Sequence, residues 1–239
     1  MSQSRRQFFN KSLQKLFTVA VGKSGEAESK TKYGFVIDLK KCIGCDACTV
    51  ACKAENKTPP GITYCWVVKD ELGEYPNVRE KFTPMLCHQC DVPPCVQVCP
   101  VKATYKMDNG IVVIDYDRCI GCRYCITACP YGARYSDFGR DFDGEKQPYE
   151  SAPTFEYGIE RTREKMKSPI GNARKCHWCY HRIKVGMKPA CVEACLGKAR
   201  FFGDLNDSSS SISQMIVKGK ANRLREELGT EPNVYYLEE

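Results

Sequence analysis

Sixteen of the seventeen cysteines in this 239-residue chain fall into four tight groups, and this spacing constrains the fold more than any other feature. The first and third groups share the spacing C-x-x-C-x-x-C-x-x-x-C. The second group is a variant of that spacing, the fourth is more open, and Cys65 is left over. The groups are Cys42, Cys45, Cys48 and Cys52; Cys87, Cys90, Cys95 and Cys99; Cys119, Cys122, Cys125 and Cys129; and Cys176, Cys179, Cys191 and Cys195.

These groups predict the ligands of four [4Fe-4S] clusters. Three cysteines separated by two residues each let a short loop surround one cuboidal cluster, and in two-cluster ferredoxins the fourth cysteine ligates the other cluster. We expect the fourth cysteine to begin a helix and to point away from the loop. Two groups then form one unit with two crossed clusters, so four groups predict two units and four centres in a row.

Two other uses of cysteine compete with this interpretation. Structural zinc sites usually take two C-x-x-C pairs separated by a longer loop, and the repeated spacing does not fit that pattern. Disulfides are common in cysteine-dense exported chains. Such density normally compensates for a small core, however, whereas 239 residues can bury a core without help.

The charge balance is consistent with bound clusters. Lys and Arg exceed Asp and Glu by 36 to 29, and the formal net charge is +7. Each oxidised four-iron core carries about +2 against four thiolates, so four centres would add about −8 and bring the total near −1. A nucleic-acid-binding chain would carry a basic stripe with interleaved aromatic residues. The sequence has no such stripe, so we expect no nucleic-acid partner.

The N-terminus resembles a twin-arginine export signal, through Ser4, Arg5, Arg6, Phe8 and Phe9. The apolar region behind it is weak and lacks a clear cleavage site, and an ordinary basic amphipathic helix is the alternative. The signal predicts export of the folded, cluster-loaded protein to the periplasmic face of the membrane; a cytoplasmic location is the alternative. No stretch reaches the 18 apolar residues of a membrane span, so we expect membrane attachment only through a partner.

The predicted fold class is α+β: two ferredoxin-like dicluster units with short strands and helices, little regular secondary structure, and the clusters in a chain. A helix is expected over 46–56 with Cys48 and Cys52 on one face. A hairpin is expected over 103–115 with its turn at Asp108, Asn109 and Gly110. Further strands are expected over 33–42, 62–68, 81–86 and, matching the hairpin, 132–138.

The cysteine groups also divide the chain into predicted segments. The outer unit carries groups one and four, and the inner unit carries groups two and three. The segments are a leader and linker (1–31), the outer unit (32–80 and 176–205), the inner unit (81–138), an inserted excursion (139–175) and a C-terminal tail with a helix (206–239).

The order of the groups, with CHQCDVPPCVQVCP second and C-x-x-C, eleven residues, C-x-x-x-C fourth, resembles the iron–sulfur subunit of membrane-associated molybdopterin oxidoreductases. This family serves dimethyl sulfoxide, polysulfide, thiosulfate, tetrathionate, arsenate and formate-dependent nitrite reductase systems. The resemblance covers roughly residues 33–205. It implies four ligand sets: Cys42, Cys45, Cys48 and Cys195 (set 1); Cys52, Cys176, Cys179 and Cys191 (set 2); Cys87, Cys90, Cys95 and Cys129 (set 3); and Cys99, Cys119, Cys122 and Cys125 (set 4).

The resemblance further implies an electron-transfer subunit of anaerobic respiration that is not an enzyme on its own. The outer unit would face a molybdopterin-binding catalytic subunit, and the inner unit would face an integral-membrane, quinone-reactive subunit. Relatives that replace the cysteine at position 122 carry a three-iron centre. The alternatives are a soluble cytoplasmic polyferredoxin and the beta subunit of a hydrogenase or formate dehydrogenase.

The sequence also supports expectations for single residues near the cysteines and for the excursion. Cys65 is expected to be a buried strand cysteine, and Arg123 a solvated arginine. Leu196 stands where the family commonly has proline. The excursion is interpreted either as a surface segment with a helix or as a partner-docking element. Side chains expected to hydrogen-bond and shield the clusters are His88, His177, Trp178, Tyr124 and Tyr131.

Overall fold

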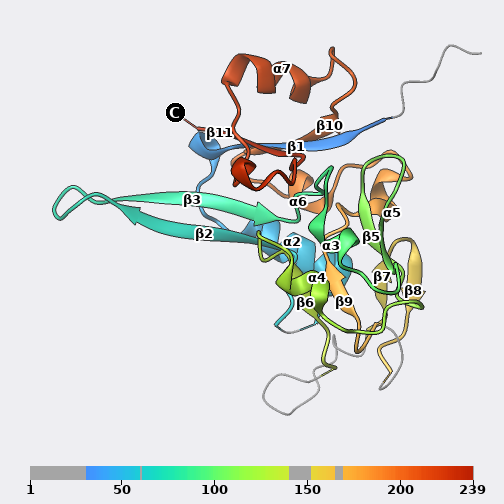
Figure 1. Cartoon of the computed structure of the whole chain (residues 1–239). Coiled ribbons are helices and arrows are strands. Elements are labelled where there is room, and N and C mark those ends of the chain that lie inside the picture. Colours follow the sequence, from blue (N-terminus) through green and yellow to red (C-terminus); the bar gives the residue numbers. More distant parts are fainter. Residues whose placement is uncertain (1–30, 60, 140–151, 165–168, 239) are drawn as a thin grey trace, which may run out of the picture.

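The computed structural model describes residues 31–59, 61–139, 152–164 and 169–238, which form short helices and strands as predicted (Figure 1). The helices are α2 (Ala47–Asn56), α3 (Pro94–Gln97), α4 (Tyr124–Thr127), α5 (Tyr180–Ile183), α6 (Ala190–Glu193) and α7 (Ser211–Gly219), with 3-10 turns η1 (Leu39–Lys41) and η4 (Glu226–Leu228). The strands are β1 (Tyr33–Asp38), β2 (Cys65–Leu72), β3 (Arg79–Leu86), β4 (Thr104–Lys106), β5 (Val112–Ile114), β6 (Arg134–Ser136), β7 (Thr154–Glu156), β8 (Ile159–Arg161), β9 (Ala173–Lys175), β10 (Arg200–Asp204) and β11 (Val234–Leu237).

One three-stranded sheet joins the two ends of the described chain (Figure 1). The predicted strand β1 pairs antiparallel with β10 and, along its other edge, parallel with β11. Phe35, Val36 and Ile37 of β1 are fully buried. The sheet therefore brings the segment before the first cysteine group beside the segment after the fourth. The tail contains the expected helix, α7, but β11 is a strand that the sequence pattern did not predict.

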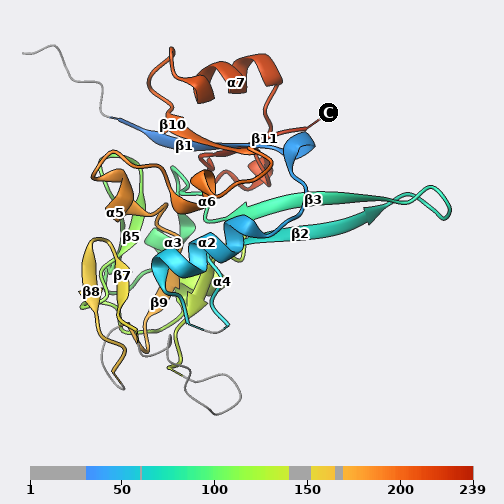
Figure 2. The same ribbon diagram turned by 180° about the vertical axis from the view of Figure 1, so that it is seen from behind.

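The helix α2 was predicted over 46–56, one residue longer than observed, and it buries one face. Its buried side chains are Cys48, Cys52 and Asn56, four residues apart, which is the spacing of a single helix face. The helix packs against α6, which carries Cys191 of the fourth group (Figure 2). The packing of α2 on α6 brings the first and fourth cysteine groups together.

The strands β2 and β3 form a hairpin that projects from the rest of the molecule (Figures 1 and 2). At its base Cys65 pairs with Leu86, and both side chains are buried. At its tip Tyr75 is 92% exposed. Both strands were predicted, and each is longer than expected, since β2 continues to Leu72 and β3 begins at Arg79.

The predicted hairpin between groups two and three is present as β4 and β5. Gly110 in its turn has φ +85°, a left-handed conformation that favours glycine. The strand predicted over 132–138 is present as β6, but it does not match this hairpin. It pairs with β9, which lies directly before the fourth cysteine group.

The excursion between groups three and four was interpreted either as a surface segment with a helix or as a partner-docking element. Its described residues (139, 152–164 and 169–175) contain the hairpin β7–β8 and the strand β9, and no helix. The side chains of Thr154 and Glu156 are 0% and 1% exposed. Thr154 and Glu156 of β7 therefore lie in the protein interior, whereas Ile159 and Glu160 of β8 are exposed.

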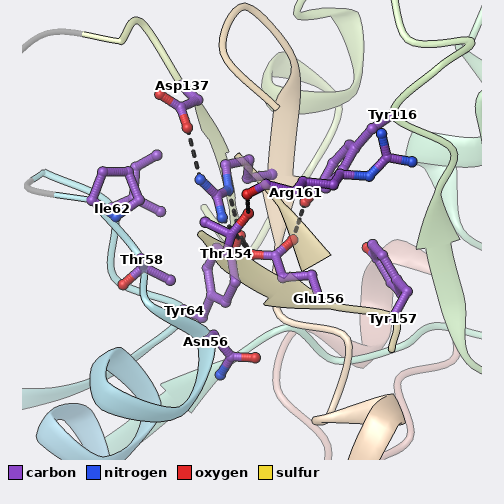
Figure 3. Close-up of polar contacts among 12 residues, drawn as sticks. Asn56, Thr58, Ile62, Tyr64, Tyr116, Asp137, Thr154, Glu156, Tyr157 and Arg161 are labelled. Carbon is purple, nitrogen blue, oxygen red and sulfur yellow. Dashed lines mark hydrogen bonds and ion pairs between the residues drawn. The ribbon is translucent and has the colours of Figure 1, made fainter. Parts of the chain in front are cut away.

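Glu156 anchors the excursion through a buried polar network (Figure 3). Its carboxylate accepts hydrogen bonds from Tyr64 Oη at 2.6 Å, from Arg174 Nη2 at 2.6 Å and from Tyr116 Oη. Arg174 also donates to Asp137 at 2.7 Å. Burial alone would raise the pKa of Glu156, but Arg174 and the hydroxyls outweigh it and hold the pKa below its usual value. The network joins segments from before the second group to after the third.

Candidate metal centres

Each cysteine group places its third member in a helix and its fourth member one turn later. The fourth member lies within α2 in the first group and just beyond the helix in the others. The expectation that the fourth cysteine begins a helix is therefore wrong, because each helix begins one residue before the third cysteine. The third members are Cys48 in α2, Cys95 in α3, Cys125 in α4 and Cys191 in α6.

The first three cysteines of the first group and the last cysteine of the fourth group line one cavity. Burial raises the pKa of Cys42, and the nearby thiols of Cys48 and Cys195 add to the shift. The structure thus brings together the cysteines of set 1. The thiols that line this cavity are Cys42, Cys45, Cys48 and Cys195.

The first three cysteines of the second group and the last cysteine of the third group line a second cavity. Burial raises the pKa of Cys90 to about 12, with Cys87, Cys95 and Cys129 adding to the shift. These four thiols all line the cavity, and they are the cysteines of set 3.

The remaining sets are recognised by neighbouring thiols. Burial raises the pKa of Cys52 well above its usual value, and the next causes are three thiols of the fourth group. This neighbourhood is that of set 2: Cys52, Cys176, Cys179 and Cys191.

In set 4, Cys125 of α4 lies near Cys119, whose thiol adds to the raised pKa that burial gives Cys125. Cys122 lies two residues before the start of α4. Cys99 follows α3, which packs against α4.

The loops of the first and third groups each require a glycine between the first two cysteines. Gly44 and Gly121 have φ values of +66° and +69°. A Cβ on Gly44 would lie 2.5 Å from the Phe82 ring, and one on Gly121 would lie 2.2 Å from the Gly171 carbonyl oxygen. Only glycine meets both requirements, so these loops pack tightly beside the thiols.

The chemistry of the donor sets fits iron–sulfur clusters. All seventeen cysteines lie within the described residues and all are free thiols, so the disulfide alternative is wrong. Among those residues, no group of three or more His, Cys, Asp or Glu side chains is arranged to hold a single metal ion. Four thiols around a shared cavity are the donors by which proteins hold [4Fe-4S] clusters.

Cys65 lies between the two outer sets. It is 1% exposed at the start of β2, as predicted for a buried strand cysteine. Its neighbours are Cys191 of set 2 and Cys48 of set 1, which together with burial raise the pKa of the Cys65 thiol well above its usual value. No local pattern indicates this bridging position, because the three cysteines come from distant segments.

The other two neighbouring pairs of sets also approach each other. Cys87 of set 3 is near Cys176 of set 2, where its thiol adds to the raised pKa that burial gives Cys176. Cys95 of set 3 is likewise near Cys125 of set 4. With the Cys65 bridge, these neighbours arrange the sets in the order 1, 2, 3, 4.

Exposed cysteines occur only at the two ends of this order. Cys45 of set 1 and Cys122 of set 4 are exposed, whereas no cysteine of sets 2 and 3 is. Each exposed thiol has an exposed isoleucine two residues before it, Ile43 at 60% and Ile120 at 65%. The ends of the series thus reach the surface beside apolar side chains.

Most of the side chains expected to shield the clusters are buried. His88 stacks on Tyr131 with ring centroids 3.9 Å apart. Burial lowers the pKa of both His88 and His177 to about 3, so both imidazoles are neutral at neutral pH. Trp178 is 1% exposed. The expectation for Tyr124 is wrong, since this side chain is 64% exposed.

Asn56 is a cysteine partner that sequence reasoning missed. Its Nδ2 donates to the Cys52 sulfur at 3.5 Å and to the Cys179 sulfur at 3.8 Å. Both sulfurs belong to set 2. The available signal was its position four residues after Cys52 on the face of a predicted helix.

Two other expectations concern residues at the surface. Arg123 is exposed, as expected, and its guanidinium lies 4.4 Å from the centre of the Phe138 ring. Leu196 is 71% exposed. The helix α6 before it has four residues, as do α3 and α4, so the missing proline leaves the helix length unchanged.

The twin-arginine motif at Arg5 and Arg6 lies outside the described residues and stays a prediction. In the part of the chain that the structure describes, no helix combines the length and apolar character needed to cross a membrane.

Comparison with known proteins identifies the family to which the chain is similar. Two models, each described as a 4Fe-4S dicluster domain, match residues 78–141 and 111–196. A selenate reductase subunit of Mesobacillus selenatarsenatis is 59% identical over 206 residues, covering 84% of this chain and 70% of the relative. A putative dimethyl sulfoxide reductase iron–sulfur subunit of Halobacterium salinarum is 40% identical (87% and 79%). The iron–sulfur cluster-binding subunit of menaquinone reductase from Nitratidesulfovibrio vulgaris is 39% identical (88% and 90%).

Proposed function

Since this chain belongs to the family of iron–sulfur electron-transfer subunits of dimethyl sulfoxide reductase-type molybdopterin oxidoreductases, we propose that it carries four [4Fe-4S] clusters that relay electrons between two partner subunits. Its relatives are iron–sulfur subunits of reductase complexes. The chain accordingly transfers electrons within such a complex, and catalysis takes place in a partner subunit.

The observation that carries the proposal is the series of thiol sets with exposed ligands only at its ends. Electrons enter beside one exposed thiol, pass through the two interior sets, and leave beside the other. The end ligands are Cys45 and Cys122. When bound, the clusters supply the redox chemistry, and the protein supplies spacing, burial and hydrogen bonds.

The chain's own residues have separable tasks in this relay. Sets 1 to 4 each hold one cluster. Asn56 directs an N–H donor at set 2, and the buried Trp178 and the stacked pair His88 and Tyr131 exclude water from the interior. These contacts keep the two middle clusters away from solvent.

The partners follow from the two exposed ends. We place a molybdopterin-binding catalytic subunit at the Cys45 end and an integral-membrane, quinone-reactive subunit at the Cys122 end. The similarity to a menaquinone reductase subunit supports the link to a quinone. The motif at Arg5 and Arg6 supports an extracytoplasmic location, and replacing both arginines by lysine is expected to retain the protein in the cytoplasm, as judged by cell fractionation.

Native anaerobic purification from membranes tests the proposal. We expect about 16 iron atoms and a similar amount of acid-labile sulfide per chain, together with molybdenum, a large pterin-binding chain and a small hydrophobic chain. Far fewer iron atoms in the loaded protein would contradict the four clusters. A fully loaded chain without partners would instead support a soluble polyferredoxin.

A further inference from the structure

Arg200 is buried between the two outer thiol sets. It is 3% exposed, and its Nη2 donates to the Cys65 sulfur at 3.1 Å. Its Nη1 is buried and has no hydrogen-bond partner among the described residues. The thiols of Cys65, Cys191 and Cys48 surround it and, against the effect of burial, hold the pKa of the guanidinium above its usual value. The arginine thus lies at the junction of sets 1 and 2.

Arg134 has the equivalent position between the two inner sets. It is also 3% exposed, with Nη2 donating to the Cys95 sulfur at 3.0 Å and Nη1 to Thr104 Oγ1 at 3.2 Å. Cys95 belongs to set 3, and Cys125 of set 4 is a further neighbour. This arginine lies at the junction of sets 3 and 4.

The two arginines also correspond in sequence. Each follows the last cysteine of its group by five residues and comes directly after an alanine, in CPYGAR and CLGKAR. Each is the first residue of a strand, β6 for Arg134 and β10 for Arg200. The same local structure therefore places one buried arginine in each unit.

Lys175 supplies a cation at the remaining junction. It is 0% exposed and directly precedes Cys176 of set 2. Its Nζ donates to Cys176 O at 2.6 Å, to Gln89 Oε1 at 3.2 Å and to Val112 O. Gln89 directly precedes Cys90 of set 3. Three acceptors match the three N–H donors of an ammonium group.

None of these three cations has a carboxylate partner within the described residues. A buried charge without a counter-charge is strongly destabilising. A cluster-loaded set, however, carries about −2 when oxidised and one more negative charge when reduced. The clusters therefore provide the missing counter-charge, and a nearby cation favours their reduced state.

We propose that Arg200, Lys175 and Arg134 form a series of buried cations, one at each junction between neighbouring clusters, that raises the reduction potentials of the two clusters beside each cation. This inference rests on the proposed function, because it requires bound clusters. Each transfer moves one electron from a reduced cluster to its oxidised neighbour, and the cation between them stabilises both reduced forms.

Redox titrations of the intact complex, followed by electron paramagnetic resonance, test this assignment. In Arg200→Met, we expect the ratio of reduced to oxidised cluster at a fixed potential to fall at least about tenfold for clusters 1 and 2, a shift of about 59 mV for one electron. Clusters 3 and 4 should stay unchanged. Arg134→Met should show the reverse pattern, and Lys175→Met should shift clusters 2 and 3.

Two control variants distinguish the effect of the buried positive charge on the potentials from the effect of side-chain shape. Arg200→Lys retains the charge and should keep the potentials close to those of the original protein. Arg123→Met removes an exposed cation beside set 4, where water screens the charge, and should change the ratio by less than about threefold. If Arg200→Met fails to load clusters, loading restored in Arg200→Lys supports the role of charge, and equal failure of both variants counts against it.

The inference is overturned if fully loaded Arg200→Met keeps its potentials, or if all four potentials shift equally. That result differs from failure of the proposed function, which would already appear in the original protein as missing iron. A loaded original protein with unmoved variant potentials leaves the relay intact and removes only the role of the cations.

Discussion

The outer and inner units share one arrangement, but the buried arginine has different hydrogen-bond partners in each. Each pairs two cysteine-bearing helices, α2 with α6 and α3 with α4, and each buries one arginine between its thiol sets. In the inner unit Arg134 donates to the Thr104 hydroxyl. In the outer unit Arg200 meets the Cys65 thiol and leaves one nitrogen unpartnered. The outer arginine therefore depends more on the bound clusters for its polar contacts.

The origin of this difference is visible in the sequence. Thr104 follows Cys99 by five residues, in CPVKAT, which is the offset of both arginines. The two halves of the inner unit thus supply a threonine and an arginine that bond to each other. In the outer unit α2 continues past Cys52 to Asn56, so no residue takes the place of the threonine. Arg200 donates instead to the sulfur of Cys65 on β2.

The strongest test of the similarity between the units removes one exposed ligand from each. We expect Cys45→Ser and Cys122→Ser each to lose or alter one centre, about 4 of about 16 iron atoms at most. Quinol-linked turnover should fall at least roughly tenfold in both, because electrons pass through every cluster of a series. Iron content, paramagnetic resonance and turnover assays provide the measurements.

An artificial donor that reduces the catalytic subunit directly bypasses the whole series. Turnover with this donor should stay within about twofold of the original in both variants. Equal loss with both donors would show that the substitutions damage assembly rather than the relay. Retained quinol-linked turnover in only one variant would mean that electrons enter at an interior cluster, and the units would not be equivalent.

The next largest expected effect is a loss of thermal stability when the buried network around Glu156 is broken. Arg174→Met leaves the carboxylates of Glu156 and Asp137 buried without this guanidinium. Breaking a buried pair costs about 3–5 kcal/mol, which lowers Tm by about 6–20 °C for a chain of this size. Anaerobic thermal denaturation of the loaded complex, followed by cluster absorbance, measures this change.

Arg161 offers a matched control on the same excursion. It pairs with Asp117, whose side chain is 71% exposed, and an exposed pair contributes about 0–1 kcal/mol. Arg161→Met should therefore lower Tm by no more than about 4 °C. Similar losses in Arg161→Met and Arg174→Met would show that the buried network has no special role in holding the excursion.

A smaller effect tests the partner of the inner arginine. Thr104→Val removes the hydroxyl that accepts from Arg134 and leaves a buried donor unsatisfied, at a cost of about 1–3 kcal/mol. The expected fall in Tm is about 2–12 °C. Thr104→Ser keeps the hydroxyl and should retain most of the stability. If the valine variant is as stable as the serine variant, the two arginines are equivalent despite their different partners.

The features that could be predicted from the sequence depend on local spacing. The cysteine spacing indicated the thiol groups, and the four-residue period of Cys48 and Cys52 indicated α2. The turn residues indicated the hairpin β4–β5. Each of these signals acts within about a dozen residues, where loop and helix geometry leave few alternatives.

The features that the sequence did not predict depend on contacts between distant segments. Arg134, Lys175 and Arg200 are of residue types that usually lie at the surface. The groups that bind them in the interior come largely from distant segments. Glu156 was likewise assigned to a surface excursion, because nothing local indicates the tyrosines and arginine that bind it. The strand β11 was missed since its pairing partner β1 lies about 200 residues earlier.

The smallest expected effect concerns the proline that the outer unit lacks. The inner unit has Pro100 and Pro130 directly after the last cysteine of each group, following helices of four residues. Leu196 follows a helix of the same length and is exposed, so proline can replace it without loss of packing. A proline that fits the native backbone stabilises the folded protein by about 0.4–1 kcal/mol, because it reduces the conformational entropy of the unfolded chain. Leu196→Pro should therefore raise Tm by about 1–4 °C. Leu196→Ala, which leaves the backbone free, should not raise it. A lower Tm in the proline variant would show that the backbone after α6 differs from that after α3 and α4, and that the two units diverge at this helix end as well.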